Sequence, residues 1–195
     1  SIVIDPHKHG LQPYGCGCVL FKDPSVGKFY KHDSPYTYFS SDDLHLGEIS
    51  LECSRPGAGA VALWATQKLF PLVANGEFSS MLDRCRSAAL KFFNILKNDE
   101  KFITAFETEL DIVIWIPKTE ALSKSSLLSK KIFDEAAKNN LHLALAELPA
   151  KFFDLKSAGI KQDKETVTCL RSVLMKPEHL DWVDEIYRIL CESLE

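Results

Sequence analysis

The sequence predicts a mixed α/β protein in two parts, and three observations lead to this fold class. Short strand-like pieces near the N-terminus are separated by prolines and glycines, a long amphipathic helix follows, and period-two strands then alternate with helices. The chain has 195 residues, of which 46% are hydrophobic and 26% are charged. A chain of this size and composition can bury a core, so we expect a globular protein.

The first part, up to about residue 76, begins with strand-like pieces at residues 2–5 and 16–22. Residues 23–58 are expected to be mostly loop, and a segment of that length without structure is typical of a lid or a binding loop. A helix is predicted after the Pro-Gly pair, over residues 58–73, with an end at Asn75–Gly76.

The second part begins with the clearest helix in the sequence, because its apolar residues form one helical stripe. The stripe consists of Phe78, Met81, Leu82, Cys85, Ala88, Ala89, Phe92, Phe93 and Leu96. Alternating apolar residues predict strands near residues 110–116, 141–145 and 167–173, with helices near residues 125–138 and 180–194. We therefore expect helices packed on one face of a small antiparallel sheet over residues 77–195, with a domain boundary at Asn75–Gly76.

Composition argues against several classes of function. The net charge is −4, and the 27 acidic and 23 basic residues are interspersed, which gives no basic stripe for a nucleic acid. The six cysteines lie mostly among apolar neighbours, which favours reduced thiols and a cytoplasmic location. Neither a membrane-spanning run nor a signal peptide is indicated. The first residues read as a strand already under way without a starting methionine, so we expect a fragment of a longer chain.

The densest group of functional side chains is the run Asp-Pro-His-Lys-His-Gly at residues 5–10, where a strand gives way to a loop. A solvated turn is the plain interpretation of such a run. Zinc binding by His7, His9, Cys16 and Cys18 is a second interpretation. It is disfavoured because structural zinc sites place two to four residues between paired ligands, whereas one residue separates each pair here.

A third interpretation comes from a longer pattern, which resembles the lysine signature of the pyridoxal-5′-phosphate (PLP) dependent group II amino-acid decarboxylases. The matching residues are Ser1, Ile2, Lys8, His9, Gly10, Tyr14, Cys16, Val19 and Lys22. This family includes aromatic-amino-acid, histidine, tyrosine and glutamate decarboxylases. Residues 34–36 (Ser-Pro-Tyr) resemble its mobile catalytic loop, and residues 54–58 resemble its Arg-Pro-Gly turn before a helix. The similarity extends over essentially the whole chain and is strongest up to Trp64.

The resemblance implies the fold of PLP-dependent transferases of fold type I, similar to aspartate aminotransferase. Residues 1–76 would then be the end of the PLP-binding large domain, and residues 77–195 the small C-terminal α+β domain. The family's pyridine-nitrogen aspartate, ring-stacking residue and phosphate loop precede the lysine, so the N-terminal half of the enzyme would be missing here. A homodimer with its active site at the subunit interface is also implied.

For the chemistry, the resemblance implies that Lys8 carries PLP as an internal aldimine and that an L-amino acid is decarboxylated to its amine and CO2. His7 would lie near the cofactor phosphate, and Asp5 and Ser1 would contribute to the cofactor pocket. The family's proton donor to the substrate Cα is a loop tyrosine, for which we choose Tyr36.

Several assignments stay open. Tyr38 is close to Tyr36 in the loop and is the alternative proton donor. Arg55 could contact substrate or cofactor or could pair with loop carbonyls, and Arg171 is expected to be structural. Two other functions compete: a carbon–carbon lyase resembling sphingosine-1-phosphate lyase, which also has a His-Lys pair, and a catalytically silent assembly partner. The signature and the retained Lys8 favour a decarboxylase, whose substrate could be tyrosine, another aromatic amino acid, glutamate or aspartate.

Overall fold

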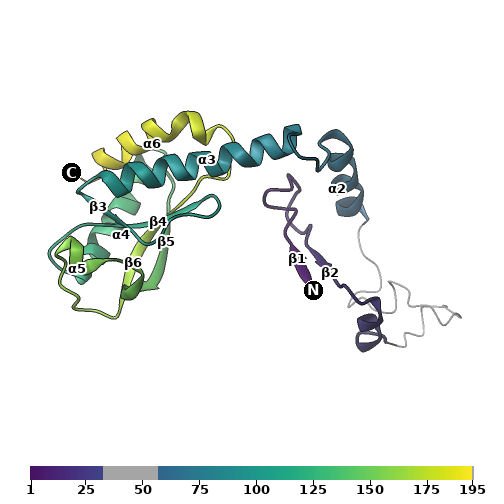
Figure 1. Ribbon diagram of the computed structural model, residues 1–195, viewed down its shortest axis with the longest axis horizontal. Coiled ribbons are helices and arrows are strands. Elements are labelled where there is room, and N and C mark those ends of the chain that lie inside the picture. Colours follow the sequence, from purple (N-terminus) through teal and green to yellow (C-terminus); the bar gives the residue numbers. More distant parts are fainter. Residues whose placement is uncertain (33–56, 195) are drawn as a thin grey trace, which may run out of the picture. The chain divides into compact units, whose positions relative to one another are not determined.

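The computed structural model describes residues 1–32 and 57–194, and the chain divides into two compact units, Ser1–Leu72 and Val73–Glu195 (Figure 1). The expected boundary at Asn75–Gly76 falls in the same short connection between two helices, just beyond this division. Within the described ranges, no helix combines the length and the hydropathy that a membrane span requires.

The first unit is built on a β-hairpin. Its elements are β1 (Ile2–Ile4), β2 (Cys18–Leu20), the 3-10 helix η1 (Pro24–Phe29) and α2 (Ala58–Leu69). The two strands are antiparallel, with Ile2 opposite Leu20 and Ile4 opposite Cys18. Both strands are shorter than the sequence predicts, and η1 is a helix within a stretch expected to be mostly loop.

Helix α2 ends at Leu69, earlier than the predicted residue 73. Pro71 explains this end, because proline disfavours helical backbone at the residue before it, which here is Phe70. Phe70 accordingly has a non-helical ψ of 78°. The helix therefore stops before the apolar pattern does.

Both faces of the hairpin are apolar and exposed. Ile2 is 63% exposed and Val3 is 69% exposed, and adjacent residues of a strand point to opposite faces. On β2, Val19 and Leu20 are likewise exposed. Strands that are apolar on both faces are typical of sheets covered by helices on each side. The hairpin therefore has the composition of strands from the middle layer of an α/β domain.

The second unit is a four-stranded antiparallel sheet with helices, in the strand order β3-β4-β6-β5. Its strands are β3 (Phe102–Thr104), β4 (Ile112–Pro117), β5 (Ala144–Pro149) and β6 (Thr166–Val173). Its helices are α3 (Glu77–Asn98), α4 (Leu122–Lys138), the short η2 (Ala150–Phe152) and α5 (Leu155–Ala158), and α6 (His179–Glu192). The antiparallel sheet is as predicted, whereas β3 was not expected and β5 begins later than the predicted strand.

The predicted stripe on α3 forms the core. Its buried residues are Cys85, Ala88, Ala89, Phe92, Phe93 and Leu96. They share one cluster with Trp115 of β4, Leu170 of β6, Ile132 of α4 and Val183 of α6, so the three long helices cover the same face of the sheet. The Trp115 indole donates a buried hydrogen bond of 3.1 Å to Ser172 Oγ. A second cluster, which includes Ile116, Val167 and Cys169, packs with η2 and α5.

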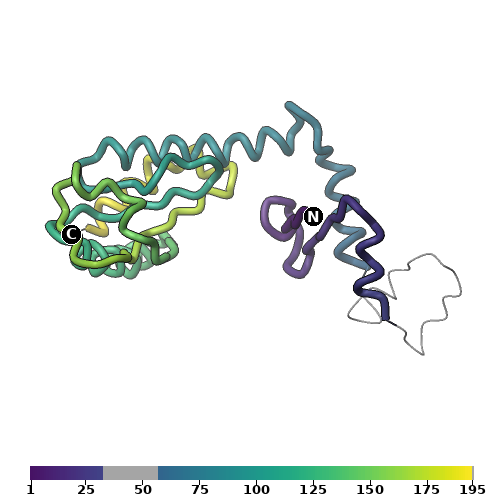
Figure 2. The backbone as a smooth tube through the Cα atoms, turned by 60° about the horizontal axis from the view of Figure 1, so that its bottom comes forward, coloured from purple at the N-terminus to yellow at the C-terminus, as the bar shows by residue number. Residues whose placement is uncertain are grey.

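Ion pairs join α3 to α6, which lie side by side (Figures 1 and 2). Arg84 pairs with Asp181 at 2.6 Å, and Lys91 pairs with Asp184 at 2.7 Å. All four side chains are at least 41% exposed, so we expect each pair to contribute only about 0–1 kcal/mol. The apolar stripe on α3, rather than these pairs, stabilises the contact.

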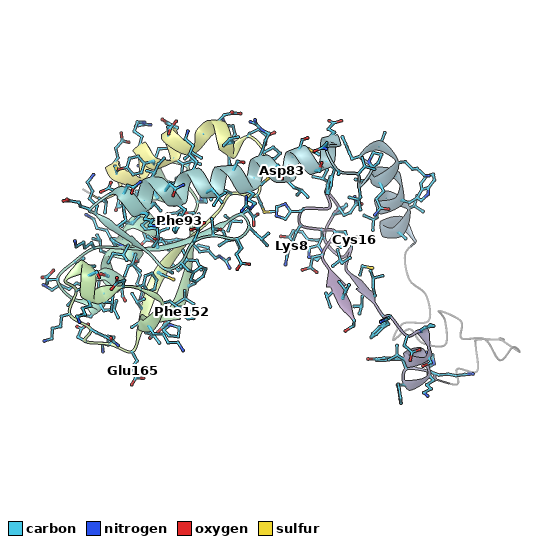
Figure 3. All side chains as sticks on the ribbon, in the orientation of Figure 1. Lys8, Cys16, Asp83, Phe93, Phe152 and Glu165 are labelled. Atoms are coloured by element: carbon cyan, nitrogen blue, oxygen red, sulfur yellow. The ribbon has the colours of Figure 1, made fainter. Side chains whose placement is uncertain are left out.

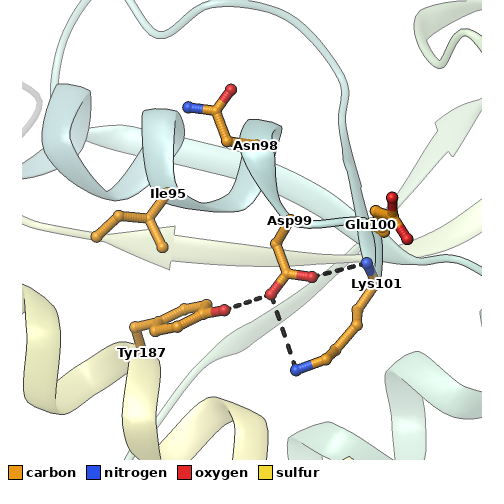
Figure 4. Close-up of a pocket in the computed structure, with 6 residues that line it drawn as sticks. All are labelled: Ile95, Asn98, Asp99, Glu100, Lys101 and Tyr187. Carbon is orange, nitrogen blue, oxygen red and sulfur yellow. Dashed lines mark hydrogen bonds and ion pairs between the residues drawn. The ribbon is translucent and has the colours of Figure 1, made fainter.

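A polar cluster closes the C-terminal end of α3 (Figure 4). The carboxylate of Asp99 accepts hydrogen bonds from the Tyr187 hydroxyl and, at 2.8 Å, from the backbone N–H of Lys101. The Lys101 ammonium lies 3.9 Å from the same carboxylate. Partial burial alone raises the pKa of Asp99, but the hydrogen bonds and the nearby ammonium outweigh it, so the pKa lies below its usual value. The cluster fixes α6 against the end of α3.

Candidate active site

The loop between β1 and β2, residues 5–17, carries Lys8 and is closed by its own backbone. Lys8 N–H donates to Asp5 O at 2.9 Å, and Gln12 N–H donates to Pro6 O at 3.1 Å. The first bond closes a turn over residues 5–8 that ends at the lysine, and the second closes a wider loop over residues 6–12 that contains it. The backbone of Lys8 is therefore held inside a compact loop rather than in an open connection.

Gly10 permits the closest approach within this loop. A Cβ atom built at Gly10 would lie 2.6 Å from the carbonyl oxygen of Pro6 and 2.7 Å from its Cα. Both are backbone atoms, so they cannot turn aside as a flexible side chain can. The next residue, Leu11, has a positive φ of 59°, an uncommon conformation for a residue with a side chain. The tight path of the chain past Pro6 therefore depends on glycine at position 10.

The amine of Lys8 is accessible. Its side chain is 62% exposed, and Nζ lies 2.7 Å from Oδ2 of Asp5 (Figure 3). The hydrogen bond from Lys8 holds the pKa of Asp5 below its usual value, with further help from the charges of Lys8 and His7. Asp5 thus keeps its negative charge beside an amine that molecules from solution can reach.

His7 has a fixed ring. Its Nδ1 lies 2.9 Å from the carbonyl oxygen of Cys16, and its backbone N–H donates to the same oxygen at 3.3 Å. A carbonyl oxygen can only accept, so Nδ1 is the donor, and Nε2 of the neutral ring is left as an acceptor. The ring of Tyr14 lies 5.5 Å from the imidazole. This engagement of Nδ1 leaves only Nε2 of His7 for a ligand.

Two contacts fasten the loop to α2. The side-chain amide of Gln12 donates to Thr66 Oγ1 at 2.7 Å, and the thiol of Cys16 lies 3.8 Å from the carbonyl oxygen of Gly59. Sequence reasoning missed both Gln12 and Thr66. The pair is separated by 54 positions, and neither residue carries a local signal for such a contact.

The structure gathers some of the predicted site residues and leaves others apart. Asp5, His7 and Lys8 lie in one loop, whereas Ser1 lies at the other end of β1. There, Ser1 borders a cavity of about 450 Å³ that is also lined by Phe21, Lys22, Asp23, Ser25, Val26, Lys28 and Phe29.

The other predicted residues lie elsewhere. Tyr36, Tyr38 and Arg55 fall outside the described residues. Arg171 is exposed on β6 of the second unit, between Ile114 of β4 and Ala144 of β5. Within residues 1–32 and 57–194, no three His, Cys, Asp or Glu side chains gather as metal ligands would.

Comparisons with known proteins agree on one family of enzymes, although no protein-family model matches the chain. The chain is 28% identical over 151 residues to an L-tyrosine decarboxylase of Enterococcus faecium, and this match covers 70% of the chain and 24% of the relative. The chain therefore spans about a quarter of that relative's length.

Two crystal structures have a similar fold. Mouse CSAD in apo form has a TM-score of 0.65 and 16% identity, over 96% of this chain and 39% of that chain. Oryza sativa TDC with PLP and tryptamine has a TM-score of 0.63 and 12% identity, over 87% of this chain and 34% of that chain. These structures show that the chain has the fold of part of a PLP-dependent enzyme of fold type I. Sequence and fold together relate this chain to the C-terminal part of the PLP-dependent group II amino-acid decarboxylases.

Proposed function

We propose that this chain is part of an enzyme that decarboxylates an L-amino acid to its amine and CO2, with PLP bound to Lys8. One observation carries the proposal: Lys8 presents an exposed amine from a loop that backbone hydrogen bonds close around it. The loop lies within the residues that resemble the family signature. The similarity to an L-tyrosine decarboxylase supports the same function.

The residues of this loop fit an aldehyde cofactor. A primary amine forms a covalent bond with an aldehyde, and Lys8 offers its amine at 62% side-chain exposure. The carboxylate of Asp5 accepts a hydrogen bond from the Lys8 ammonium and so keeps the lysine side chain close to the start of the loop. When bound, PLP supplies an electron sink for the electron pair that remains on Cα after CO2 leaves.

Contacts of His7, Asp5 and Ser1 with the cofactor are part of the proposal. The Nδ1 bond to Cys16 O fixes the imidazole of His7, so Nε2 is the ring nitrogen that would face the phosphate, as a donor when the ring is protonated. Asp5 is engaged through its carboxylate with Lys8, so its contribution to the pocket would come through that lysine. Ser1 is retained from the resemblance alone, and Tyr36 is the proposed proton donor to Cα.

A complementary polypeptide is also proposed. The exposed apolar faces of β1 and β2 support it, because such strands require cover on both faces. The partial coverage of the relatives agrees with a larger enzyme, which we propose to be a homodimer with the active site at its interface. A cytoplasmic location is supported by the free thiols of Cys85 and Cys169, whose pKa values burial raises.

L-Tyrosine is the first substrate to test, because the relative from E. faecium is a tyrosine decarboxylase. The assay should measure CO2 and tyramine with the intact natural protein and PLP. Aspartate, glutamate and other aromatic amino acids form the comparison set. Release of an aldehyde fragment in place of CO2 would support a carbon–carbon lyase.

The cofactor attachment is tested directly by borohydride reduction. The intact protein is incubated with PLP, reduced and digested, and the peptides are examined by mass spectrometry. We expect a phosphopyridoxyl group on Lys8 and none on the exposed Lys22, which serves as an internal reference. Lys8→Arg should abolish the label, whereas Lys22→Arg should retain it. A label on another lysine, or no label at all, contradicts the proposal.

A further inference from the structure

Gln12 is an unusually buried polar residue for its surroundings. It is 8% exposed, although most described side chains of the first unit are exposed or half-buried. Its Nε2 donates to the carbonyl oxygen of Gly10 at 3.0 Å and to Thr66 Oγ1 at 2.7 Å. Both hydrogens of one side-chain amide are therefore used, one within the Lys8 loop and one toward α2.

The oxygen of the same amide has no such partner. Gln12 Oε1 is buried, and no donor among the described residues reaches it. Turning the amide over would not help, because Oε1 would then face the carbonyl oxygen of Gly10 and two acceptors would oppose each other. A buried acceptor without a partner costs stability, whereas an apolar side chain at this position would not carry that cost. Packing alone therefore does not explain a glutamine at this position, and its two donated bonds must serve another purpose.

Lys8 provides that reason through the geometry of the loop. The lysine lies between Pro6 and Gly10 in sequence. Gln12 binds both of these residues, through its backbone N–H to Pro6 O and through its side chain to Gly10 O. Thr66 anchors the same side chain on a regular helix. Gln12 therefore links the residues before and after Lys8 to Thr66 on α2.

We propose that Gln12, anchored by Thr66, is a positioning residue that sets the location of Lys8 for attachment of the cofactor. This inference rests on the proposed function, because it concerns the same lysine. Gln12 does not touch the reacting atoms; it acts through the backbone of the loop. Loss of the Gln12–Thr66 bond should therefore lower the reactivity of Lys8 toward PLP without removing the amine.

Substitutions at both ends of the bond test the inference. Gln12→Met keeps the length of the side chain but donates no hydrogen bond, and Thr66→Val keeps the shape but removes the hydroxyl. Thr66→Ser is the matched control, because it retains the hydroxyl. The rate of phosphopyridoxyl labelling at Lys8 is measured in the intact protein as the labelled fraction of the Lys8 peptide over time. Amide hydrogen exchange at Lys8 and Gln12 is measured without PLP.

We expect Gln12→Met and Thr66→Val each to slow labelling of Lys8 about tenfold and to speed exchange at both amides by a similar factor. Lys22 should stay unlabelled in every variant, and Thr66→Ser should behave as the natural protein does. The double variant should be no slower than Gln12→Met, because that single variant already removes the bond to Thr66 together with the bond to Gly10.

Separate outcomes address the inference and the proposed function. If the natural protein is labelled at Lys8 and the variants match it in labelling and exchange, the inference is overturned and the proposed function stands. If the natural protein is not labelled at Lys8, the proposed function fails and the inference fails with it. Exchange at Val61, whose backbone N–H donates to Gly57 O at the start of α2, monitors folding of the first unit. If Gln12→Met loses protection from amide exchange there too, that variant is unfolded. The inference is then tested by the comparison of Thr66→Val with Thr66→Ser.

Discussion

The ammonium of Lys8 lies 2.7 Å from the carboxylate of Asp5, at the start of the loop between β1 and β2. This hydrogen bond lowers the pKa of Asp5. A carboxyl group whose pKa is lowered by folding gains an interaction that is fully present above its usual pKa and is lost as the pH falls through the lowered value. The pair is therefore intact at neutral pH and is lost in acid as the Asp5 carboxylate is protonated.

Replacing the lysine should release this carboxyl group. In Lys8→Met, we expect the pKa of Asp5 to rise toward its ordinary value, because the largest cause of its lowering is removed. Titration of the Asp5 side-chain carbon by NMR measures the change. Lys22→Met is the matched control and should leave Asp5 unaffected. An unchanged titration in Lys8→Met would mean that Asp5 and Lys8 are not paired in solution.

The tight passage at Gly10 makes a second prediction. Gly10→Ala places a Cβ atom 2.6 Å from the Pro6 carbonyl oxygen, so the loop must shift. We expect a loss of about 1–3 kcal/mol in local stability, seen as faster amide exchange at Lys8 and Gln12. Gly17→Ala is the control, because a Cβ atom there meets nothing within 4 Å. Equal exchange in the two variants would show that position 10 has no steric restriction.

The buried bond between Trp115 and Ser172 predicts a cost in the second unit. Trp115→Phe leaves Ser172 Oγ without its donor in a site where both residues are buried. We expect the free energy of unfolding to fall by about 3–5 kcal/mol, since lost aromatic volume adds to the unpaired hydroxyl. The double variant Trp115→Phe, Ser172→Ala should recover part of this loss. Chemical denaturation measures both, and no recovery would assign the whole effect to packing.

Tyr187 and Asp99 predict a dependence of stability on pH. The pKa of Asp99 is lowered in the folded protein, so its contribution is present above the usual carboxyl pKa and is lost as the pH falls through the lowered value. Tyr187→Phe removes one of the hydrogen bonds responsible. The acid-side decline in the free energy of unfolding should become shallower in this variant. Denaturation at a series of pH values tests this, and parallel curves for the two proteins would contradict it.

The elements that the sequence predicts well are those whose periodicity is long. The α3 stripe runs from Phe78 to Leu96, and its C-terminal residues are the buried ones. β3 has three residues, too few to establish a period of two. The strand predicted at residues 141–145 was placed too early, because Leu141 and Leu143 pack against the core before the ladder of β5 begins at Ala144. An apolar alternation therefore marks residues that pack against the core, whether or not they pair in a sheet.

In the candidate site, too, local features of the sequence could be recognised and contacts between distant residues could not. Lys8 and His7 could be named as candidates, because their spacing to other signature residues is a local property of the sequence, and their roles stay predictions. The support of the loop could not, because it joins Gln12 to Thr66 across 54 positions. Contacts of that kind depend on how α2 packs against the hairpin, which no window of neighbouring residues contains.

The proposed proton donor gives the last prediction. Tyr36→Phe in the complete enzyme keeps the aromatic ring but removes the only acidic proton of the side chain. If Tyr36 protonates Cα after CO2 leaves, the variant should lose about 10²–10⁴-fold in amine formation, and part of the substrate should leave by other reactions of the cofactor. Tyr38→Phe is the matched control and should keep the amine yield. Amine, CO2 and aldehyde are quantified together from one reaction. An unchanged amine yield in Tyr36→Phe with a loss in Tyr38→Phe would transfer the role to Tyr38, and unchanged yields in both would remove the loop tyrosines from the mechanism.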